Sequence, residues 1–344
     1  MVKAAVVPET GAKLEIRDRP VPEPGPGQVL VRMLASGLCH TDVHLLRGDW
    51  PLRPRPSTVP GHEGVGVVEE LGPGASLHRP GERVAISWLG SACGHCEHCV
   101  SGWENLCEDQ CDTGCSADGT FAEYALTDDR YAVAVPEELS AVDAAALTCA
   151  GTAAFRAVKV SRLAAGELVA VFGVGGLGHL AIQYARMAGG RVVAVDVDDE
   201  KLDLARRVGA DHLVDARFAD PSVEIGLLGG AGVALALAPS AESLAQAYRS
   251  LRRGGRLVCV ALPARGALTV PLFDAVTGGK TVTGSIGGTR RDTADVFALH
   301  AAGRTCVVAE TRALEDVNTC LAELRAGEIP ARVVLDLGAS LWSL

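Results

Sequence analysis

Apolar residues follow two different patterns in the two halves of the chain. Val29, Val31, Met33 and Ala35 recur at every second position, and this period predicts a strand with one buried face. Further on, the apolar segment Leu168–Phe172 is unbroken, as is typical of a parallel strand that is buried on both faces. The patterns therefore predict a β-rich part first and an α/β part later.

The first part is predicted to be a small β-rich domain. Short strands are expected at Ala4–Val7 and Leu14–Ile16, joined by a glycine turn. The segment Pro20–Gly27 and the proline- and arginine-rich stretch before Pro60 are expected to be surface loops, because proline suits neither a helix interior nor a central strand. No long helical pattern occurs before Ala85.

The chain is predicted to be helical from Ala141 to Lys159, after which strands and helices follow one another. In chain order they are expected at Leu168–Phe172, His179–Ala188, Arg191–Val195, Lys201–Val208, His212–Val214, Val233–Leu237, Ala241–Arg252, Arg256–Ala261 and Thr281–Ser285. Such a succession favours a parallel, doubly wound sheet. The last segment, which ends in Ala331–Leu337, is expected to return to the first domain.

Composition supports a folded protein of two domains. The 344 residues exceed the usual size of one core, and 48% hydrophobic with 22% charged residues is a globular composition. Aromatic residues make up only 4%, so the core is expected to consist mostly of Ala, Val and Leu. A net charge of −10 disfavours nucleic acid and anionic membranes as partners.

Two further features predict a soluble, cytoplasmic protein. The N-terminus lacks the long apolar segment of a signal peptide, and no uncharged apolar run reaches the roughly 18 residues that suggest a membrane span. Eleven cysteines without a secretory signal favour a reducing compartment, where they serve as ligands or core residues.

The most specific motif contains four cysteines separated by two, two and seven residues: Cys93, Cys96, Cys99 and Cys107. Thiolates at these intervals can surround one tetrahedral Zn²⁺ at S–Zn distances of about 2.3 Å. Since the protein supplies all four ligands, no position is left for a substrate, and the site is predicted to be structural. Unrelated cysteines in an exposed loop are the alternative, but free thiols at this density are an oxidation hazard.

A second group of polar side chains follows the first predicted strand. The stretch Cys39–His44 contains a thiol, a hydroxyl, a carboxylate and two imidazoles, and Gly61–Gly64 adds an imidazole and a carboxylate between glycines. Another thiol, Cys149, precedes Gly151 by two positions. Taken alone, Cys39 is as well explained as a small buried core residue, so its interpretation depends on the rest of the chain.

A glycine-rich segment continues directly from the unbroken strand. The G-x-G-x-x-G pattern alone is weak, but strand, glycines, helix, second strand and terminal acid stand in the order that a dinucleotide requires. The glycines let the backbone approach a pyrophosphate, and the helix N-terminus favours its negative charge. The terminal acid, Asp196, can accept hydrogen bonds from both ribose hydroxyls. Lys201 is the only cation near it in the sequence. The predicted cofactor residues are Gly173, Gly175, Gly176, Leu177, Gly178, Asp196 and Lys201. A glycine-rich turn in a domain that binds no dinucleotide is the alternative.

Together the motifs resemble the medium-chain, zinc-dependent alcohol dehydrogenases, in particular their bacterial primary-alcohol branch. The resemblance covers essentially the whole chain, and it rests on Gly37–Asp42, Gly48–Pro51, Pro60–Gly66, Cys93–Cys107, Cys149–Gly151, Gly173–His179, Asp196 and Arg332–Asp336. It implies a two-domain α/β fold. A GroES-like catalytic domain is expected at residues 1–149 and 287–344, with a structural zinc lobe at 91–115, and a Rossmann cofactor domain at 150–286.

The resemblance also implies a catalytic zinc site. It makes Cys39, His62 and Cys149 the zinc ligands, with water or the substrate oxygen in the fourth position. Glu63 resembles the family's acidic residue behind the metal. Asp42 resembles the carboxylate that orients the imidazole ligand.

Further positions resemble the proton relay, the cofactor contacts and the substrate pocket of the family. Thr41 is similar to the hydroxyl that takes the alcohol proton and relays it, through the cofactor ribose, to His44. Contacts to the cofactor phosphates are implied for His40 and Arg332. The resemblance implies that Trp50 and Trp88 line a narrow substrate pocket. Core or surface positions are the alternative for each of them.

The implied function is interconversion of small primary alcohols and aldehydes with NAD, two zinc ions per chain and a homotetramer or dimer. Asp196 speaks against the NADP-linked aldehyde reductases of the same superfamily, and the intact set of zinc ligands speaks against a zinc-free quinone reductase. A non-catalytic protein that retains the fold would need neither Thr41 nor His44. A zinc-ribbon nucleic-acid binder fits Cys93–Cys107 but not the net charge.

Some positions depart from the family pattern. Ala153 stands where a threonine that touches the nicotinamide is frequent, and Thr152 comes one residue earlier. Cys115 replaces a common aromatic residue, and Cys111 is an additional thiol. The segment Gly287–Arg290 carries a glycine where a bulkier apolar residue is frequent. These changes concern nicotinamide positioning and catalytic efficiency more than the reaction class.

Overall fold

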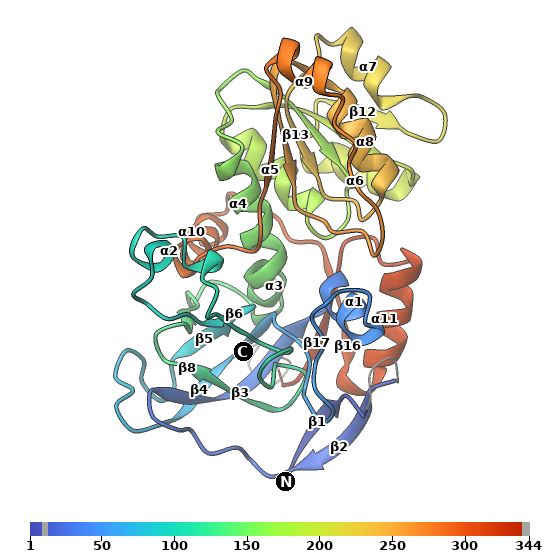
Figure 1. Ribbon diagram of the computed structural model, residues 1–344. Coiled ribbons are helices and arrows are strands. Elements are labelled where there is room, and N and C mark those ends of the chain that lie inside the picture. Colours follow the sequence, from blue (N-terminus) through green and yellow to red (C-terminus); the bar gives the residue numbers. More distant parts are fainter. Residues whose placement is uncertain (9–12, 339–344) are drawn as a thin grey trace. The chain divides into compact units, whose positions relative to one another are not determined.

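The computed structural model describes residues 1–8 and 13–338 (Figure 1). The chain forms two compact units, one made of Met1–Thr152 and Gly287–Leu344 and the other of Ala153–Ile286. The glycine turn expected between the first two strands falls in residues 9–12, outside the described residues.

The first unit is built on a sheet whose described strands run in the order β16, β17, β3, β4, β5 and β9, with β8 also paired to β3. Their bounds are β3 (Gln28–Gly37), β4 (Gly64–Leu71), β5 (Arg83–Ile86), β8 (Tyr124–Asp128), β9 (Val133–Ala134), β16 (Ala309–Ala313) and β17 (Arg332–Asp336). Val29, Val31 and Met33 of β3 are buried, as their spacing predicts. Leu30, Leu34 and Ser36 on the other face are buried as well, so the strand is buried on two faces rather than on the one predicted. Near the end of the chain, β17 pairs with β3, with Leu335 opposite Ser36.

Shorter elements surround this sheet. They are β1 (Val2–Val6), β2 (Glu15–Arg19), β6 (Leu89–Ser91), β7 (Cys111–Asp112), α1 (His40–Arg47), α2 (Glu97–Val100), α10 (Arg290–Ala301) and α11 (Val317–Ala326). The apolar pattern did not predict α1. This helix has only eight residues, about two turns, which is too short for a repeating pattern to stand out.

Residues 141–160 form one helical stretch in which α3 (Ala141–Ala146) and α4 (Thr152–Val160) flank a π-helical turn, Leu147–Gly151. The sequence predicted one continuous helix, Ala141–Lys159, without this π turn. Single π turns within helices are frequent at functional sites. By length and composition alone the stretch could cross a membrane, but 72% of its apolar window is buried within the protein, as in the core helix of a globular fold.

The second unit contains a parallel sheet in the order β12, β11, β10, β13, β14 and β15. Because this order reverses direction at β10, right-handed crossovers place helices on opposite faces of the sheet. The elements are β10 (Leu168–Phe172), β11 (Arg191–Asp196), β12 (His212–Asp215), β13 (Ala231–Ala236), β14 (Leu251–Cys259), β15 (Thr281–Gly284), α5 (Gly178–Met187), α6 (Asp199–Arg207), α7 (Pro221–Leu227), α8 (Ala241–Arg249) and α9 (Leu272–Gly278).

The predicted fold class is confirmed, with local differences. Helices α7 and α9 were not predicted from the sequence, and α8 ends at Arg249 rather than Arg252 because β14 already begins at Leu251. The core beneath the second sheet is rich in Ala, Val and Leu, with Phe172 and Tyr248 as its buried aromatic side chains. The low aromatic content of the chain therefore does not prevent a packed core.

Candidate active site

Four potential metal ligands meet in the first unit. Ligand atoms of Cys39, His62, Glu63 and Cys149 all lie within 4.8 Å of one another. Cys39 follows β3, His62 and Glu63 directly precede β4, and Cys149 lies in the π turn. Because β3 and β4 are antiparallel neighbours, the end of one strand lies beside the start of the other. The structure thus brings together the residues that the sequence analysis assigned to a catalytic zinc.

Asp42 connects the first two ligands. Its Oδ2 accepts a hydrogen bond from the Cys39 backbone N–H at 2.9 Å, while the Cys39 sulfur accepts from the Thr41 N–H at 3.5 Å, so both groups cap the start of α1. Its Oδ1 lies 3.2 Å from Nδ1 of His62, and both side chains are only 1% exposed. With Nδ1 facing a carboxylate, Nε2 is the imidazole nitrogen available to a metal.

Burial and mutual contact shift the pKa values of this group. A hydrogen bond from Cys149 lowers the pKa of Cys39 well below its usual value. The same bond, together with burial, raises the pKa of Cys149 well above its usual value. Burial raises the pKa of Glu63 to about 7, although the charge of Arg332 opposes it. Metal binding releases protons from such ligands, because a thiolate and a carboxylate are the forms that coordinate.

Glu63 and Arg332 form a buried ion pair, in which Nη2 of the arginine contacts Oε2 of the glutamate. Gly37, at the end of β3, makes this position possible, because a Cβ there would overlap the Glu63 carboxylate. Arg332 was predicted to contact cofactor phosphates, and the structure places it at the start of β17, 4% exposed. Its Nε has no hydrogen-bond partner among the described residues.

The donor set fits a catalytic zinc ion. Two thiols and one imidazole in a single group match the sites in which three protein ligands leave one position open. Asp42 supplies the carboxylate that commonly supports a metal-bound imidazole. The buried Oε1 of Glu63 has no hydrogen-bond partner within the described residues, so this oxygen retains its capacity to approach a cation.

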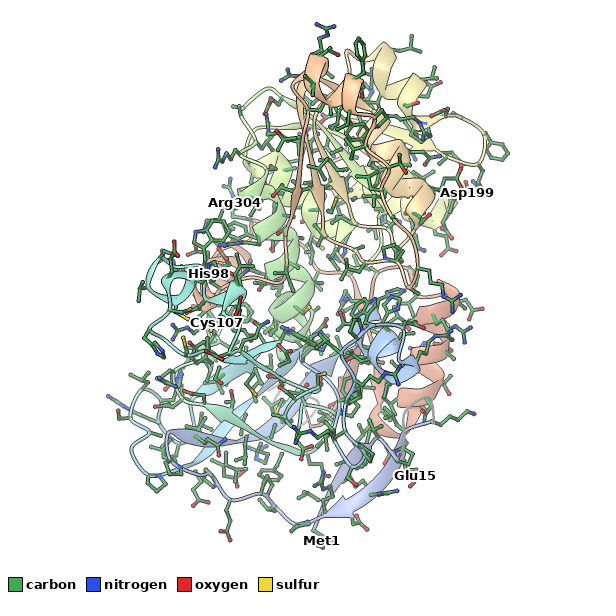
Figure 2. All side chains as sticks on the ribbon, viewed as in Figure 1. Met1, Glu15, His98, Cys107, Asp199 and Arg304 are labelled. Atoms are coloured by element: carbon green, nitrogen blue, oxygen red, sulfur yellow. The ribbon has the colours of Figure 1, made fainter. Side chains whose placement is uncertain are left out.

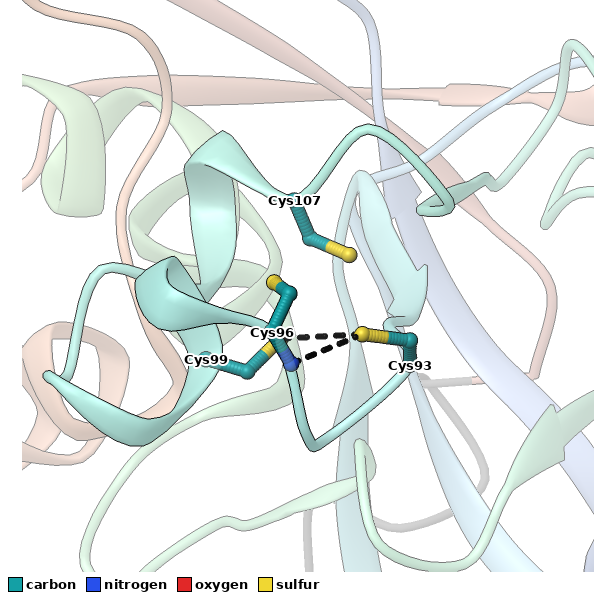
Figure 3. A group of neighbouring side chains, drawn as sticks. All are labelled: Cys93, Cys96, Cys99 and Cys107. Carbon is teal, nitrogen blue, oxygen red and sulfur yellow. Dashed lines mark hydrogen bonds between the residues drawn. The ribbon is translucent and has the colours of Figure 1, made fainter.

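The four-cysteine motif forms a second, separate group in the same unit (Figure 3). The sulfur atoms of Cys93 and Cys99 are 3.9 Å apart, close to the roughly 3.8 Å that a tetrahedral ion with 2.3 Å S–Zn bonds requires. The Cys96 N–H donates to the Cys93 sulfur at 3.3 Å. Four sulfurs within 4.8 Å of one another fit a closed structural zinc site. His95, exposed between them, instead places Nδ1 3.0 Å from the Cys93 carbonyl oxygen.

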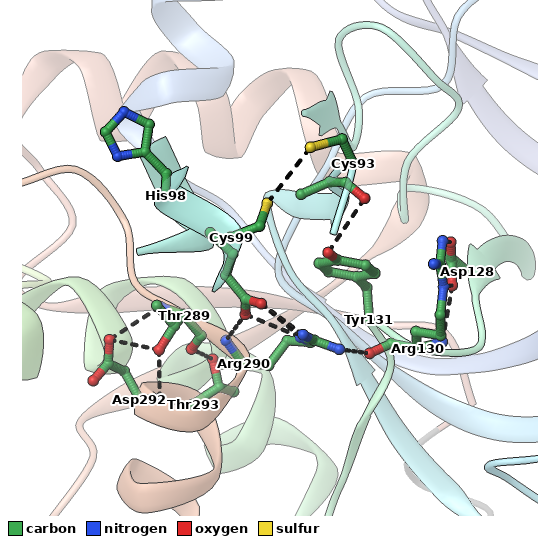
Figure 4. A network of polar contacts seen from close by, with 12 residues as sticks. Cys93, His98, Cys99, Asp128, Arg130, Tyr131, Thr289, Arg290, Asp292 and Thr293 are labelled. Carbon is green, nitrogen blue, oxygen red and sulfur yellow. Dashed lines mark hydrogen bonds and ion pairs between the residues drawn. The ribbon is translucent and has the colours of Figure 1, made fainter. Parts of the chain in front are cut away.

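An ion pair ties the four-cysteine lobe to α10 (Figure 4). Arg290 donates to both carboxylate oxygens of Glu104, which lies between the third and fourth cysteines, at 2.9 Å and 2.6 Å. The guanidinium also lies over the Tyr131 ring, 4.2 Å from its centre. A pocket of about 440 Å³ opens beside this network. Its arginines pair with neighbouring carboxylates, so the pocket does not offer an uncompensated anion site.

The predicted relay residues lie on α1. Thr41 and His44 are three positions apart, which places them on one helix face. Nδ1 of His44 lies 3.0 Å from Oδ2 of Asp49, and the imidazole stacks on Trp50 with ring centres 4.5 Å apart. The sequence analysis assigned no role to Asp49. His40, a predicted cofactor contact, is exposed at the start of the helix.

Trp88, predicted to line the substrate pocket, lies against a candidate zinc ligand. Its ring meets His62 edge-on, with centres 5.2 Å apart and planes at 89°. Burial raises the pKa of nearby Asp112, and a hydrogen bond from Trp88 opposes that shift. Of the two thiols near Asp112, Cys111 in β7 is partly buried and Cys115 is buried.

Two departures from the family pattern explain each other. A Cβ on Gly288 would overlap the Thr152 methyl group. The Thr152 hydroxyl donates to the Leu147 carbonyl at 3.2 Å and contacts the Thr293 hydroxyl at 3.1 Å. A bulkier residue at 288 would therefore displace the threonine that closes the π turn around Cys149.

In the second unit, the glycine loop follows β10 as predicted. Gly173 has φ +93°, which glycine adopts without strain, and a Cβ on Gly178 would overlap the Gly173 carbonyl. No atom lies within 4 Å of the Cβ position of Gly175, so the backbone is open on that side. Leu177, the N-cap of α5, makes no side-chain cap, which suits the binding of a phosphate at the helix N-terminus.

Asp196 is fixed beside this loop at the end of β11. Its Oδ2 accepts a hydrogen bond from the Val174 N–H at 2.7 Å, and its Oδ1 accepts from the Val197 N–H at 2.8 Å. The carboxylate is partly exposed, so unused lone pairs remain for a ribose hydroxyl. The structure therefore joins the acid and the glycine loop into one arrangement.

The expectation that Lys201 is the only cation near this acid is corrected by the structure. Arg217 follows β12, which pairs with β11 so that Asp196 lies opposite Asp215. The Arg217 guanidinium contacts Asp199 and Asp215, each at 2.5 Å; Asp199 is labelled in Figure 2. The arginine comes 21 positions after Asp196, and only the strand pairing reveals that it is near.

Comparisons with known proteins identify the family of the chain. Residues 25–137 match the family model "Alcohol dehydrogenase GroES-like domain" and residues 176–302 match "Zinc-binding dehydrogenase". An alcohol dehydrogenase of Moraxella sp. (strain TAE123) is 44% identical over 97% of this chain and 99% of its own length. The crystal structure of the alcohol dehydrogenase from Aeropyrum pernix is similar, with a TM-score of 0.90 and 35% identity over 97% of this chain and 99% of that one.

Solved structures with either nicotinamide coenzyme are also similar. The acetophenone reductase from Geotrichum candidum, in complex with NAD, has a TM-score of 0.87 and 29% identity over 97% of both chains. A putative zinc-binding dehydrogenase from Sinorhizobium meliloti, bound to NADP, has a TM-score of 0.87 and 30% identity over 98% of this chain and 99% of that one.

Proposed function

Since the chain belongs to the medium-chain, zinc-dependent alcohol dehydrogenases, we propose that it interconverts small primary alcohols and aldehydes with NAD as the coenzyme. The observation that carries this proposal is the buried group of Cys39, His62, Glu63 and Cys149 in the first unit. We assign catalysis to residues 1–149 and 287–344, and coenzyme binding to residues 150–286, close to the division of the chain into its two units.

The proposed catalytic ligands are Cys39, His62 and Cys149. Zinc, when bound there, acts as a Lewis acid that lowers the pKa of an alcohol hydroxyl and leaves one position for the substrate oxygen. The chain itself holds the donors in place, since Asp42 orients the imidazole and Arg332 anchors Glu63. The four cysteines of the lobe hold a second zinc ion that is structural.

The proposed proton path begins on α1. Thr41 is the proposed first acceptor of the alcohol proton and His44 its final acceptor, and a bound coenzyme would supply a ribose hydroxyl between them. The first of these residues is two positions from a proposed zinc ligand and the second is one helical turn further on. The coenzyme, when bound, takes up the hydride, so the chain has to move only the proton.

The preference for NAD follows from the charges near the end of β11. Asp196 can accept a hydrogen bond from a free 2′-hydroxyl, whereas a 2′-phosphate would bring like charges together. Arg217 follows the neighbouring strand β12, but it already contacts Asp199 and Asp215. Lys201 is proposed to contact the ribose.

A homo-oligomer, either a dimer or a tetramer, is part of the proposal. β15 is an edge strand of its sheet, and α9 exposes Leu272, Phe273 and Val276 by 78%, 83% and 77%. Exposed apolar side chains beside an unpaired strand edge favour association. Light scattering should give a multiple of the chain mass, and Phe273→Ser should weaken the assembly. A monomeric wild type would contradict this point.

Metal analysis together with kinetics on both coenzymes tests the proposed function. We expect about two zinc ions per chain, turnover of short primary alcohols and a preference for NAD. Turnover only with NADP and aldehydes would favour the related reductases instead.

All eleven cysteines are free thiols in the structure, and we propose the reducing cytoplasm as the location.

A further inference from the structure

The end of α1 brings Asp49 back to the helix. Gly48 takes the left-handed conformation, φ +67° and ψ +32°, that ends the helix. The next N–H, that of Asp49, donates to the His44 carbonyl at 3.0 Å. A carboxylate that follows the histidine by five positions is thereby returned to the level of the imidazole.

The imidazole of His44 is held by two neighbours, Asp49 and Trp50. Its Nδ1 lies 3.0 Å from Oδ2 of Asp49, and the two side chains are 11% and 17% exposed. The same carboxylate oxygen accepts from Nε of Arg47 at 3.2 Å. Trp50 covers one face of the ring, with the planes inclined by 25°. Position and plane of the ring are therefore both constrained.

The opposite nitrogen of the ring is unused. Nε2 of His44 is buried and has no hydrogen-bond partner among the described residues. A hydrogen bond from His44 lowers the pKa of Asp49, so the carboxylate is ionised at neutral pH and can only accept. Nδ1 must then carry the hydrogen, and in a neutral imidazole Nε2 is left as an acceptor.

We propose that Asp49 is a positioning residue of the proton relay, which holds His44 as the Nδ1–H tautomer and keeps Nε2 open to receive the proton released from the alcohol. The inference rests on the relay in the proposed function and adds a member to it. On transfer, one proton bonds to Nε2 and Nδ1 keeps its own. The resulting imidazolium lies beside the Asp49 carboxylate, which stabilises its charge.

A double-mutant cycle tests this role. Asp49→Ala should lower kcat by about 10- to 100-fold, the range found when the carboxylate behind a functional imidazole is removed. The KM values should change by no more than about threefold, because the proposal has Asp49 act through His44 and not on substrate or coenzyme directly. In a His44→Gln background, Asp49→Ala should cause no further loss of kcat. A purely structural role would lower activity and thermal stability in both backgrounds.

Two matched variants refine the cycle. Asp49→Asn keeps an oxygen that can accept from Nδ1–H but lacks the charge, so its kcat should lie between those of the wild type and Asp49→Ala. Arg47→Gln removes the other partner of the carboxylate and leaves the His44 contact, so it should change kcat by less than about threefold. A loss in Arg47→Gln as large as that in Asp49→Ala would overturn the assignment.

The tautomer can be observed directly by ¹⁵N NMR of protein labelled at histidine, with the His44 signals assigned by their absence in His44→Gln. The wild type should show hydrogen on Nδ1, and Asp49→Ala should shift the population to Nε2–H. Hydrogen on Nε2 in the wild type would overturn the proposal.

If His44→Gln itself keeps full kcat, the relay fails. If it loses kcat while Asp49→Ala does not, the relay stands and only the role of Asp49 is refuted.

Discussion

The two cysteine-containing groups of the first unit differ in how their ligands come together. The lobe draws its four sulfurs from a single stretch, residues 93–107, joined by short loops and α2. The other group draws its donors from the end of β3, the start of β4 and the π turn, which span residues 39–149. One group is local in the chain, whereas the other exists only because the sheet is formed.

Their surroundings differ in the same way. Three of the four lobe cysteines are partly exposed, and the lobe is anchored from outside by Arg290 and Glu104. The other group, Cys39, His62, Glu63 and Cys149, is called the mixed group because it combines thiols, an imidazole and a carboxylate. It is enclosed by charged residues, with Asp42 behind His62 and Arg332 behind Glu63. A closed set of thiolates needs little support, whereas a site with an open position depends on neighbours that fix each donor. This difference is expected of a structural and a catalytic site.

Loss of a ligand from each group gives the largest contrast. Cys39→Ala should remove one zinc ion per chain and abolish turnover, because the substrate would lose its Lewis acid, while the fold survives. Turnover and zinc content are measured on the same preparation. Cys306→Ala, an exposed cysteine in neither group, serves as the control and should retain both zinc ions. One zinc ion in the wild type would refute the two-site assignment.

The matching change in the lobe should act on stability. Cys96→Ala should remove the other zinc ion and lower the free energy of unfolding, since structural zinc can contribute on the order of 10 kcal/mol to folding. Thermal unfolding with and without a chelator measures this effect. If the variant unfolds at the wild-type temperature, the lobe does not stabilise the fold.

The proton relay separates the groups further, because it begins beside the mixed group only. Thr41→Ala should leave zinc and NAD binding largely intact and lower turnover by about 10²–10⁴-fold, the usual contribution of general acid–base steps. His44→Gln should lose less and recover partly at high pH, where solvent base accepts the proton. Steady-state rates across pH test both variants, and full activity in Thr41→Ala would refute the relay.

The contrast between local and distant contacts also explains what sequence reasoning could reach. The lobe and the glycine loop could be identified because their residues lie within a few positions of one another, and the family resemblance located the mixed group. The fold class followed from period-two and unbroken apolar segments. Short elements such as α1 and α9 carry too few residues for a periodic signal.

What could not be predicted depends on contacts across the fold. Asp49 returns to His44 through a left-handed turn at Gly48, and the sequence shows the glycine but not the contact. Arg217 reaches the end of β11 through strand pairing. A glycine in the segment Gly287–Arg290 was noted as a departure, but the contact of Gly288 with the methyl group of Thr152 is visible only in three dimensions.

Coenzyme preference is the next largest expected effect. One lost hydrogen bond to a charged group costs roughly 1.5–3 kcal/mol, and charge repulsion adds to it, so kcat/KM should favour NAD by at least about 100-fold. Asp196→Ser should reduce this preference, chiefly by weakening NAD use. Steady-state kinetics with both coenzymes at saturating alcohol decide the point. Equal efficiency in the wild type would mean that Arg217 or Lys201 holds the 2′-phosphate.

Arg217 allows a finer test of the same preference. Combining Asp196→Ser with Asp199→Ser removes one of the two carboxylates that contact the arginine. The double variant should use NADP better than Asp196→Ser alone. The gain should be small, because ion pairs of exposed side chains contribute only about 0–1 kcal/mol, and Asp199 is 80% exposed. The single variant Asp199→Ser should keep the preference for NAD.

A final prediction addresses the support of the mixed group without touching a ligand. In Gly37→Ala, the new methyl group would meet the Glu63 carboxylate, and overpacking a buried site typically costs 1–3 kcal/mol. Glu63 and Arg332 would have to shift, so zinc should be lost to a chelator about 5- to 150-fold more readily from this group, while the lobe keeps its ion. Gly66→Ala is the matched control, since its methyl group would meet the Arg32 carbonyl and the Val31 side chain in the same sheet and no donor of either group. It should lower the unfolding temperature without changing zinc retention, because it strains the sheet and no donor. Chelator competition at a temperature where all variants are folded distinguishes the two. Equal zinc loss in both variants would show that the mixed group responds to the sheet as a whole rather than to the position of Glu63.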